Sequence, residues 1–404
     1  MDKDAALGEK VAFYRRRRGL SQVEFAALVG RSESWVSQVE RGVRTVDRMS
    51  VLAQVADVLN VPVADLARER AVPEPSPAGH YVDELRMALS GHPALGVLLA
   101  GPNADKLVLE VEQLQEKVSA AWPMAHASRY GELGPVLASL IPELEEAARR
   151  SPARKTRAVK KLLAEVYQAA SAMLAKLDEP EAAWVAADRA LLAGEQAGDP
   201  LLAAAGQYRM AQAFLSSGRL EQAREVARRG VEALGAPVVS NDPQRVSLWG
   251  AMQLVLATVS AREGDRRAAR SHLGEARRAG EALGGDRNDF DTEFGPTNVA
   301  VHEVGVAVEL GDAGEALDTA ATVDASALSA ERRARFLIDL ALAYSQRRRG
   351  AEALRALEEA EALTPEQIHD HHVVRQIVTD LLQGEGRRPH PELQAFARRI
   401  GALP

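Results

Sequence analysis

The first 66 residues carry apolar side chains at intervals of three or four positions, in short runs closed by glycine or polar turn residues. This spacing places each run on one face of a helix and predicts five short helices joined by tight turns. The fifth is expected to run from Val63 to Leu66. The apolar faces of the first four are, in chain order, Leu7, Val11 and Tyr14; Phe25, Ala26 and Val29; Val36 and Val39; and Met49, Leu52, Val55, Ala56 and Leu59.

The ends of these helices carry signals of their own. Ser21 and Glu24 are spaced as a capping box, in which the serine hydroxyl accepts from the Glu24 amide and the Glu24 carboxylate accepts from the Ser21 amide. Ser32 is placed to cap the next helix, and Gly42 to end it with a positive φ. Two short helices joined by a turn at Gly30 are typical of a helix-turn-helix arrangement.

From Leu107 onward the pattern changes to longer helices that recur in pairs. Residues 210–234 and 341–365 are similar to tetratricopeptide repeats, but the units are 37 to 47 residues apart and exceed the usual ~34 residues of such repeats. The pattern therefore favours an elongated helical-repeat solenoid, with an irregular helical bundle as the alternative. Five second helices carry an alanine five residues after a turn residue, in the pairs Asp178 and Ala183, Gly218 and Ala223, Gly264 and Ala269, Gly311 and Ala316, and Arg348 and Ala353.

A proline-rich stretch separates these two parts of the chain. Residues 68–80 hold three prolines and show no apolar periodicity, which is typical of an extended spacer. We therefore expect an all-α protein with a helix-turn-helix domain in residues 1–67, a linker in residues 68–80, and a helical-repeat domain for sensing or dimerisation in residues 81–404.

Residues 285–305, GDRNDFDTEFGPTNVAVHEVG, interrupt the repeats with a polar, acidic run. A helix is expected to begin at Pro296, because the N–H that proline lacks would have no hydrogen-bond partner at the first position of a helix. One interpretation is that the free amides after this proline hold an anion or a peptide carboxylate under a lid. The other is that Phe290 and Phe294 plug the repeats while Asp286 and its neighbours cap helix ends.

Composition and charge narrow the class of protein. The 404 residues include no cysteine, which excludes disulfides and thiolate metal sites, and no apolar run approaches the roughly 18 residues of a membrane span. The start of the chain does not resemble a signal peptide, so a cytoplasmic, nucleoid-associated protein is expected. Residues 1–70 are net +2 and the remainder is net −9, so a local DNA contact is compatible with the overall charge of −7.

Catalytic and metal-binding signals are weak. His369, His371 and His372 lack a carboxylate pair at ligand spacing and are interpreted as polar surface. The acidic run around Phe290 lacks the oxygen ligand and the glycine of an EF-hand loop. No phosphate-binding glycine loop or nucleophile elbow is present. We expect no enzymatic activity, no cofactor and no bound metal.

Residues 19–42, GLSQVEFAALVGRSESWVSQVERG, resemble the Xre class of phage-repressor helix-turn-helix domains, and the resemblance extends from Leu7 to Leu66. It implies a lambda-repressor-like fold whose recognition helix enters the major groove of double-stranded DNA. Gln38 is then suited to pair bidentately with adenine, and Glu33 to accept from a cytosine amino group. Glu33 departs from the pattern because its carboxylate repels phosphate.

The resemblance also implies supporting roles. Arg15 and Glu40 are expected to pair structurally, and the Trp35 indole either reaches a phosphate or packs against the linker. Gln22 and the arginines at the far end of the recognition helix are expected to contact phosphates. The full set of expected DNA-binding residues is Gln22, Ser32, Glu33, Ser34, Trp35, Ser37, Gln38, Arg41, Arg44 and Arg48.

Head and repeats together resemble actinobacterial Xre-type regulators with a tetratricopeptide-like C-terminal region, over nearly the whole chain. This implies a transcriptional regulator, and because one domain reads only a short half-site we expect a homodimer on a two-fold operator. The repeats would bind a small-molecule or peptide effector in a concave groove; the alternative is a DNA-tethered scaffold that binds a partner protein constitutively. The expected groove residues are Tyr208, Trp249, Gln253, Asn298, His302 and Tyr344.

Overall fold

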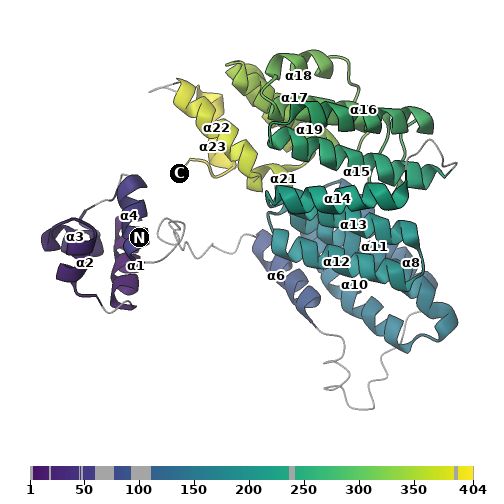
Figure 1. Cartoon of the computed structure of the whole chain (residues 1–404), viewed down its shortest axis with the longest axis horizontal. Coiled ribbons are helices and arrows are strands. Elements are labelled where there is room, and N and C mark those ends of the chain that lie inside the picture. The colour runs from purple at the N-terminus through teal and green to yellow at the C-terminus, as the bar shows by residue number, and fades with distance from the viewer. Residues whose placement is uncertain are drawn as a thin grey trace. The chain divides into compact units, whose positions relative to one another are not determined.

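The computed structural model describes two units, residues 1–76 and 77–404, each considered by itself. All regular elements in the described part of the chain are helices, which confirms the all-α prediction (Figure 1). No helix among the described residues is long and apolar enough to cross a membrane. The described residues are 3–17, 20–44, 46, 49–59, 77–91, 111–235, 242–385 and 390–403.

Four short helices in the N-terminal unit enclose a small apolar core, with Phe25 and Val36 fully buried at its centre. The capping box between Ser21 and Glu24 is present, and Gly42 has the expected positive φ of 69°. The expected fifth helix and Arg48 lie outside the described residues. The helices are α1 (Lys3–Arg17), α2 (Gln22–Leu28), α3 (Glu33–Glu40) and α4 (Met49–Leu59).

A buried ion pair ties α1 to the end of α3. Arg15 donates from Nε and Nη2 to the Glu40 carboxylate at 2.5 and 3.0 Å, and Gln22 of α2 donates to the same carboxylate at 2.7 Å. Burial alone would raise the pKa of Glu40, but these donors hold it below its usual range. The expected structural pairing of Arg15 and Glu40 is therefore confirmed, and one carboxylate fixes the relative positions of three helices.

The C-terminal unit begins earlier than expected. The first helix, α6, starts at Pro77, so residues 77–80 belong to this helix and not to the linker expected over residues 68–80. The helices that follow are α8 (Val111–Ser119), α9 (Ala121–His126), α10 (Tyr130–Arg150), α11 (Ala153–Lys176), α12 (Pro180–Gln196), α13 (Pro200–Ser216), α14 (Leu220–Leu234), α15 (Pro243–Arg262), α16 (Arg266–Leu283), α17 (Pro296–Glu309), α18 (Ala313–Ala320), α19 (Ala330–Gln346), α20 (Gly350–Leu363), α21 (Pro365–Asp370), α22 (His372–Glu385) and α23 (Pro391–Arg399).

Helices α11 to α20 stack as five antiparallel pairs, as the sequence spacing predicts (Figure 1). Each of the five turn residues has a positive φ, between 58° and 79°, which reverses the chain after the first helix of its pair. Each of the five matching alanines is fully buried. Helices α12 and α13 approach so closely that a Cβ on Gly194 or Gly206 would lie 2.6 Å from the facing backbone, which only glycine permits.

The array of helices curves until early and late members meet. Ser128, in the turn between α9 and α10, donates from its hydroxyl to the Gln367 side chain in α21 at 3.1 Å. The amide of Gly131 in α10 donates to the Glu366 carboxylate at 2.9 Å. These contacts join segments at least 235 residues apart in the sequence and enclose an interior space between the first helices of the pairs.

The loop between α16 and α17 packs into the array through its aromatic residues. Phe294 is fully buried over Gly250 of α15, and the half-buried Phe290 contacts two apolar clusters. Asp286 accepts from the Thr297 amide at 3.0 Å, so this helix end is capped by a side chain of the chain itself. The aromatic packing and the Asp286 cap that the plug interpretation expects are therefore present, and Asp286 occupies the Thr297 amide, where an anion was the other expectation.

The contact between Phe294 and Gly250 gives a direct test of this packing. A Cβ at residue 250 would lie 2.0 Å from Cζ of Phe294, so Gly250→Ala is expected to lower the free energy of unfolding by roughly 1–3 kcal/mol in a urea titration. The control is Gly274→Ala in α16, where nothing lies within 4 Å; it is expected to stabilise by roughly 0.5–1 kcal/mol. Equal effects of the two substitutions would contradict the plug.

Candidate DNA interface and interior pocket

Helix α3 is anchored on one face and presents polar side chains on the other. The Ser32 hydroxyl caps it by accepting from the Trp35 amide at 3.2 Å, and Val36 and Val39 are buried. Glu33 and Ser34 are exposed, and Ser37 and Gln38 are half-buried. The expected base-reading residues therefore lie on the N-terminal turns of a rigidly held helix, as a recognition helix requires.

Gln22, expected to contact a phosphate, and Trp35, expected to reach a phosphate or the linker, contact other residues of their own domain. Gln22 donates to Glu40, so it must exchange this partner to reach a phosphate. Arg31 lies over the Trp35 ring at 5.7 Å, and the half-buried indole packs against the core of its own unit. Arg41 and Arg44 are exposed at the end of α3, close enough to solvent to approach a DNA backbone, and Arg41 also donates from Nε to the Ser37 carbonyl at 3.1 Å.

A cavity of about 610 Å³ lies inside the curved array of the C-terminal unit. The first helices of all five pairs line it, together with α9, α10, α21 and the loop between α16 and α17. Two of the expected groove residues, Tyr208 and His302, line this cavity. A cavity of this size suits a small organic molecule.

The other four expected groove residues lie elsewhere, which corrects the sequence interpretation. Trp249 is buried in the apolar core, and Tyr344 packs beside Arg349. Gln253 bonds His272 at 2.7 Å between α15 and α16. Asn298 donates to the Glu293 carbonyl at 2.8 Å and thereby anchors the loop. All four stabilise packing between helices.

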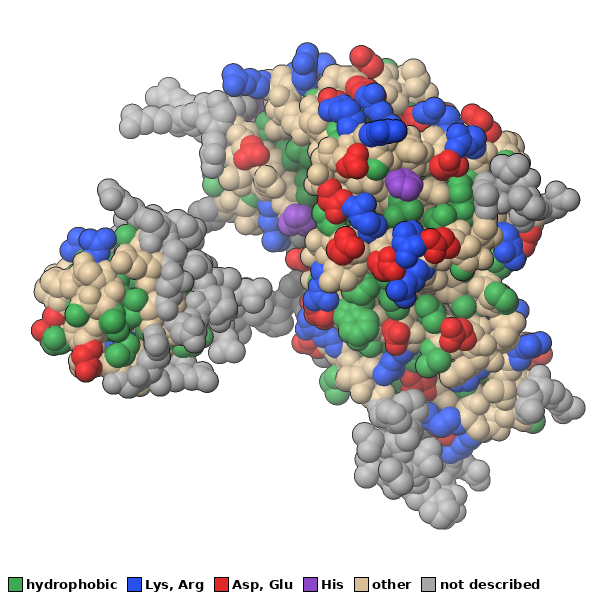
Figure 2. All heavy atoms as spheres, in the orientation of Figure 1, with side chains coloured by type: hydrophobic (Ala, Val, Ile, Leu, Met, Phe, Trp, Pro, Cys, Tyr) green, Lys and Arg blue, Asp and Glu red, His purple; other side chains and the backbone are tan. Residues whose placement is uncertain are grey.

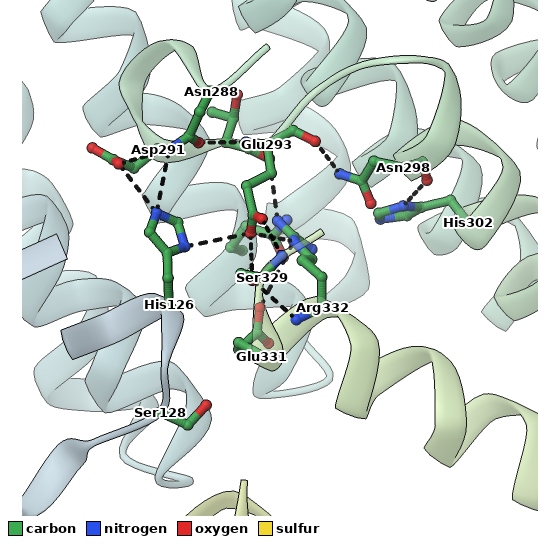
Figure 3. A network of polar contacts seen from close by, with 12 residues as sticks. His126, Ser128, Asn288, Asp291, Glu293, Asn298, His302, Ser329, Glu331 and Arg332 are labelled. Atoms are coloured by element: carbon green, nitrogen blue, oxygen red, sulfur yellow. Dashed lines mark hydrogen bonds and ion pairs between the residues drawn. The ribbon is translucent and has the colours of Figure 1, made fainter. Parts of the chain in front are cut away.

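A polar network joins α9, the loop and α19 at one side of the cavity (Figure 3). His126 contacts Asp291 through Nε2 at 3.1 Å and Glu293 through Nδ1 at 3.4 Å. Burial alone would lower the pKa of His126, but the two carboxylates raise it to about 9. Glu293 also accepts from the amide and hydroxyl of Ser329, both at 2.9 Å, so it caps α19. One protonated imidazole thus fastens the loop across the repeats.

Neighbouring cations shift the pKa values of two rings on another side of the cavity, whose wall also carries acidic side chains such as Glu331 and Asp339. Burial and the charges of Arg332, Arg335 and Lys176 lower the pKa of His302 to about 4. Burial alone would raise the pKa of Tyr208, but Arg332 and Arg209 hold it below its usual range. Both ring systems therefore respond to the same cluster of cations.

The sequence interpretation missed the charged residues of the cavity. Glu331 is buried, and although burial would raise its pKa, Lys176 and Arg332 hold it at about 2. Arg209 is only 6% exposed. Arginine and glutamate are common on exposed helix faces, so their burial depends on the curvature of the array and no local pattern signals it.

Of the three histidines near residue 370, His371 differs from the expected polar surface position, while His372 is exposed as expected. His371 is half-buried in the cavity wall, stacked on His372 at 5.4 Å, and not on a polar surface. Burial, Arg335 and His372 lower the pKa of His371 to about 3. His369 instead bonds Glu361 at 2.8 Å, away from the cavity. Among the residues that the structure describes, no group of three or more His, Asp or Glu is arranged to hold a metal ion.

Comparison with known proteins identifies the N-terminal unit. Residues 6–68 match the family model of a helix-turn-helix domain, so the chain contains this domain at its N-terminus. Among solved structures, the chain is similar to the crystal structure of Bacillus thuringiensis PlcR in complex with the peptide PapR7 and DNA, with 14% identity and a TM-score of 0.28 over 69% of this chain and 96% of that one. No curated protein sequence matches the chain.

The His126 contacts predict a specific dependence of stability on pH. Because the pKa of His126 is raised from 6.5 in the unfolded chain to about 9, its stabilisation is complete below pH 6.5 and is lost as pH rises through 9. The difference in free energy of unfolding between wild type and His126→Gln is expected to fall by roughly 2 kcal/mol from pH 6 to pH 9.5, after solvent screening is allowed for. Urea titrations at both pH values measure it, and a constant difference would contradict the network.

Proposed function

We propose that this protein is a sequence-specific DNA-binding transcriptional regulator of the Xre class, whose helical repeats bind an effector. The observation that carries the proposal is the helix-turn-helix match over residues 6–68. The geometry of α3 supports it, since the helix is buried on one side and polar at its N-terminal turns on the other. The assignment to the Xre class rests on the resemblance of residues 19–42.

In this proposal α3 enters the major groove. Gln38 reads an adenine edge and Glu33 accepts from a cytosine amino group, while Arg41 and Arg44 neutralise phosphates. Because a single domain of this size reads a short half-site, two copies act together on a two-fold operator. The pairing of Arg15 with Glu40 holds α3 in the orientation that this contact needs.

In this proposal the effector binds in the cavity of the C-terminal unit. Its walls include the first helix of each of the five pairs, so a molecule bound there is placed to contact several pairs and to favour one curvature of the array. A regulator needs such a difference in affinity between two states, because the effector and DNA can influence each other only through it. The alternative scaffold would bind a partner chain, for which a cavity lined by buried charges is less suitable than a long groove on the surface.

Two substitutions in α3 and in the turn after it test whether α3 reads base sequence. Binding is measured on a DNA site found by genome-wide footprinting. Gln38→Ala is expected to weaken specific binding by about 1–3 kcal/mol and to relax the preference at one base pair, because a bidentate contact is lost. The control, Arg44→Ala, is expected to weaken binding equally on specific and random DNA and to reduce the salt dependence by about one ion.

Mobility-shift titrations on the footprinted site and on random DNA at several salt concentrations measure both effects. If Gln38→Ala weakens binding to both DNAs equally, α3 does not read sequence through Gln38. If neither substitution affects binding, α3 does not form the interface.

A further inference from the structure

Buried donors without partners are concentrated around the interior cavity. In the described part of the chain, seven buried side-chain polar atoms have no hydrogen-bond partner. Five of the seven belong to residues that line the cavity, and all five are N–H or O–H groups. Since an unpaired buried donor is costly, this concentration points to a ligand rich in acceptor atoms. The five atoms are the Tyr130 hydroxyl, the Ser171 hydroxyl, Arg209 Nε, Arg332 Nε and Gln367 Nε2. Of these, Arg332 Nε makes no hydrogen bond but lies 3.5 Å from the Glu293 carboxylate.

Arg209 differs from the other cations of the cavity. Lys176, Arg262, Arg332 and Arg335 each have a carboxylate within 4 Å, at Glu331, Glu309, Glu293 and Asp339 respectively. For Arg209 no carboxylate lies within that distance among the described residues. A guanidinium cannot lose its proton in a protein, so this charge stays buried, and Asp291 and Glu331 act on it only from beyond ion-pair distance.

The surroundings of Arg209 hold it in place without neutralising it. It donates to the carbonyls of Phe290 and Asp291 at 3.1 and 2.8 Å, and it lies over the Trp122 and Tyr208 rings at 4.7 and 5.2 Å. Both carbonyls belong to residues with a positive φ, an uncommon conformation for these residue types. The loop is therefore shaped around a fixed guanidinium whose Nε remains unpaired.

Apolar side chains form another part of the same cavity wall. Leu254 and Val255 come from α15, and Val301 and Val306 from α17; all four are buried. On the face of this unit that Figure 2 shows, acidic, basic and apolar side chains are mixed without a large patch of one sign.

We propose that the cavity binds a small amphipathic organic anion, with its acid group at Arg209 and its apolar skeleton against Leu254, Val255, Val301 and Val306. This inference rests on the proposed function, in which the bound molecule is the effector. The acid group gives Arg209 a direct ion-pair partner and accepts from neighbouring donors of the cavity wall. The cavity of about 610 Å³ exceeds the size of a simple inorganic anion, so the skeleton fills the remaining space.

A matched pair of fluorescent probes tests the charge requirement with the full wild-type chain. 8-Anilinonaphthalene-1-sulfonate carries an acid group, and N-phenyl-1-naphthylamine has the same aromatic skeleton without it. We expect the sulfonate to bind one per chain, about tenfold or more tighter than the neutral analogue. Equal affinity of the two probes, or no binding of the sulfonate, would overturn the proposal.

Substitutions assign the effect to one side chain. Arg209→Met is expected to raise the Kd of the sulfonate about tenfold and to leave the Kd of the neutral probe unchanged, because only the charge-assisted contact is lost. The control Arg277→Met removes an exposed arginine of α16 outside the cavity and is expected to change neither Kd. An unchanged sulfonate Kd in folded Arg209→Met would overturn the assignment; if that variant does not fold, the wild-type probe comparison still decides.

Competition identifies the kind of anion. Decanoate, an acid with an apolar chain, is expected to displace the sulfonate probe, and inorganic phosphate at the same concentration is expected not to. Displacement by phosphate alone would overturn the amphipathic ligand. These titrations contain no DNA, so their failure and a failure of the DNA-binding tests are distinguished.

Discussion

Close contact between helix backbones determines the architecture of the C-terminal unit. Alanines at the start of each second helix are fully buried, and Gly194 and Gly206 bring two backbones within the distance that a Cβ would occupy. Helices that pack this closely have little freedom in their mutual angle. The array curves so that α10 and the turn before it contact α21, and the cavity lies between the first helices of the pairs.

The same curvature buries charged side chains, which costs free energy. The curvature turns one face of every first helix inward, and on these faces lie Lys176, Arg209, Arg332 and Arg335. Most of this charge is compensated within the wall, as by Glu331 and Glu293. A fold under selection for stability alone would replace such groups with apolar side chains, since buried ion pairs contribute little net stability. In the function proposed above, these charges serve to recognise the effector.

Local signals predicted the parts of the molecule that local interactions determine. The capping box at Ser21 and the turn at Gly42 depend on residues within a few positions of each other, and both were predicted from the sequence. The pocket depends on the orientation of each helix within the whole array. Asn298 and His302 are four residues apart on one face, yet Asn298 bonds the Glu293 carbonyl while His302 reaches the cavity. Arg209 had no distinguishing local pattern at all.

The meeting of early and late helices also changes how the repeat unit should unfold. In an open array of repeats, each end has one neighbour and frays first, so unfolding spreads inward repeat by repeat. Here the turn after α9 is bonded to α21, and α9 is bonded through His126 to the loop before α17. Helices at distant positions in the sequence therefore lose their contacts together. The unit should therefore unfold in one cooperative transition. A destabilising substitution in any one helix should lower the free energy of unfolding of the whole unit.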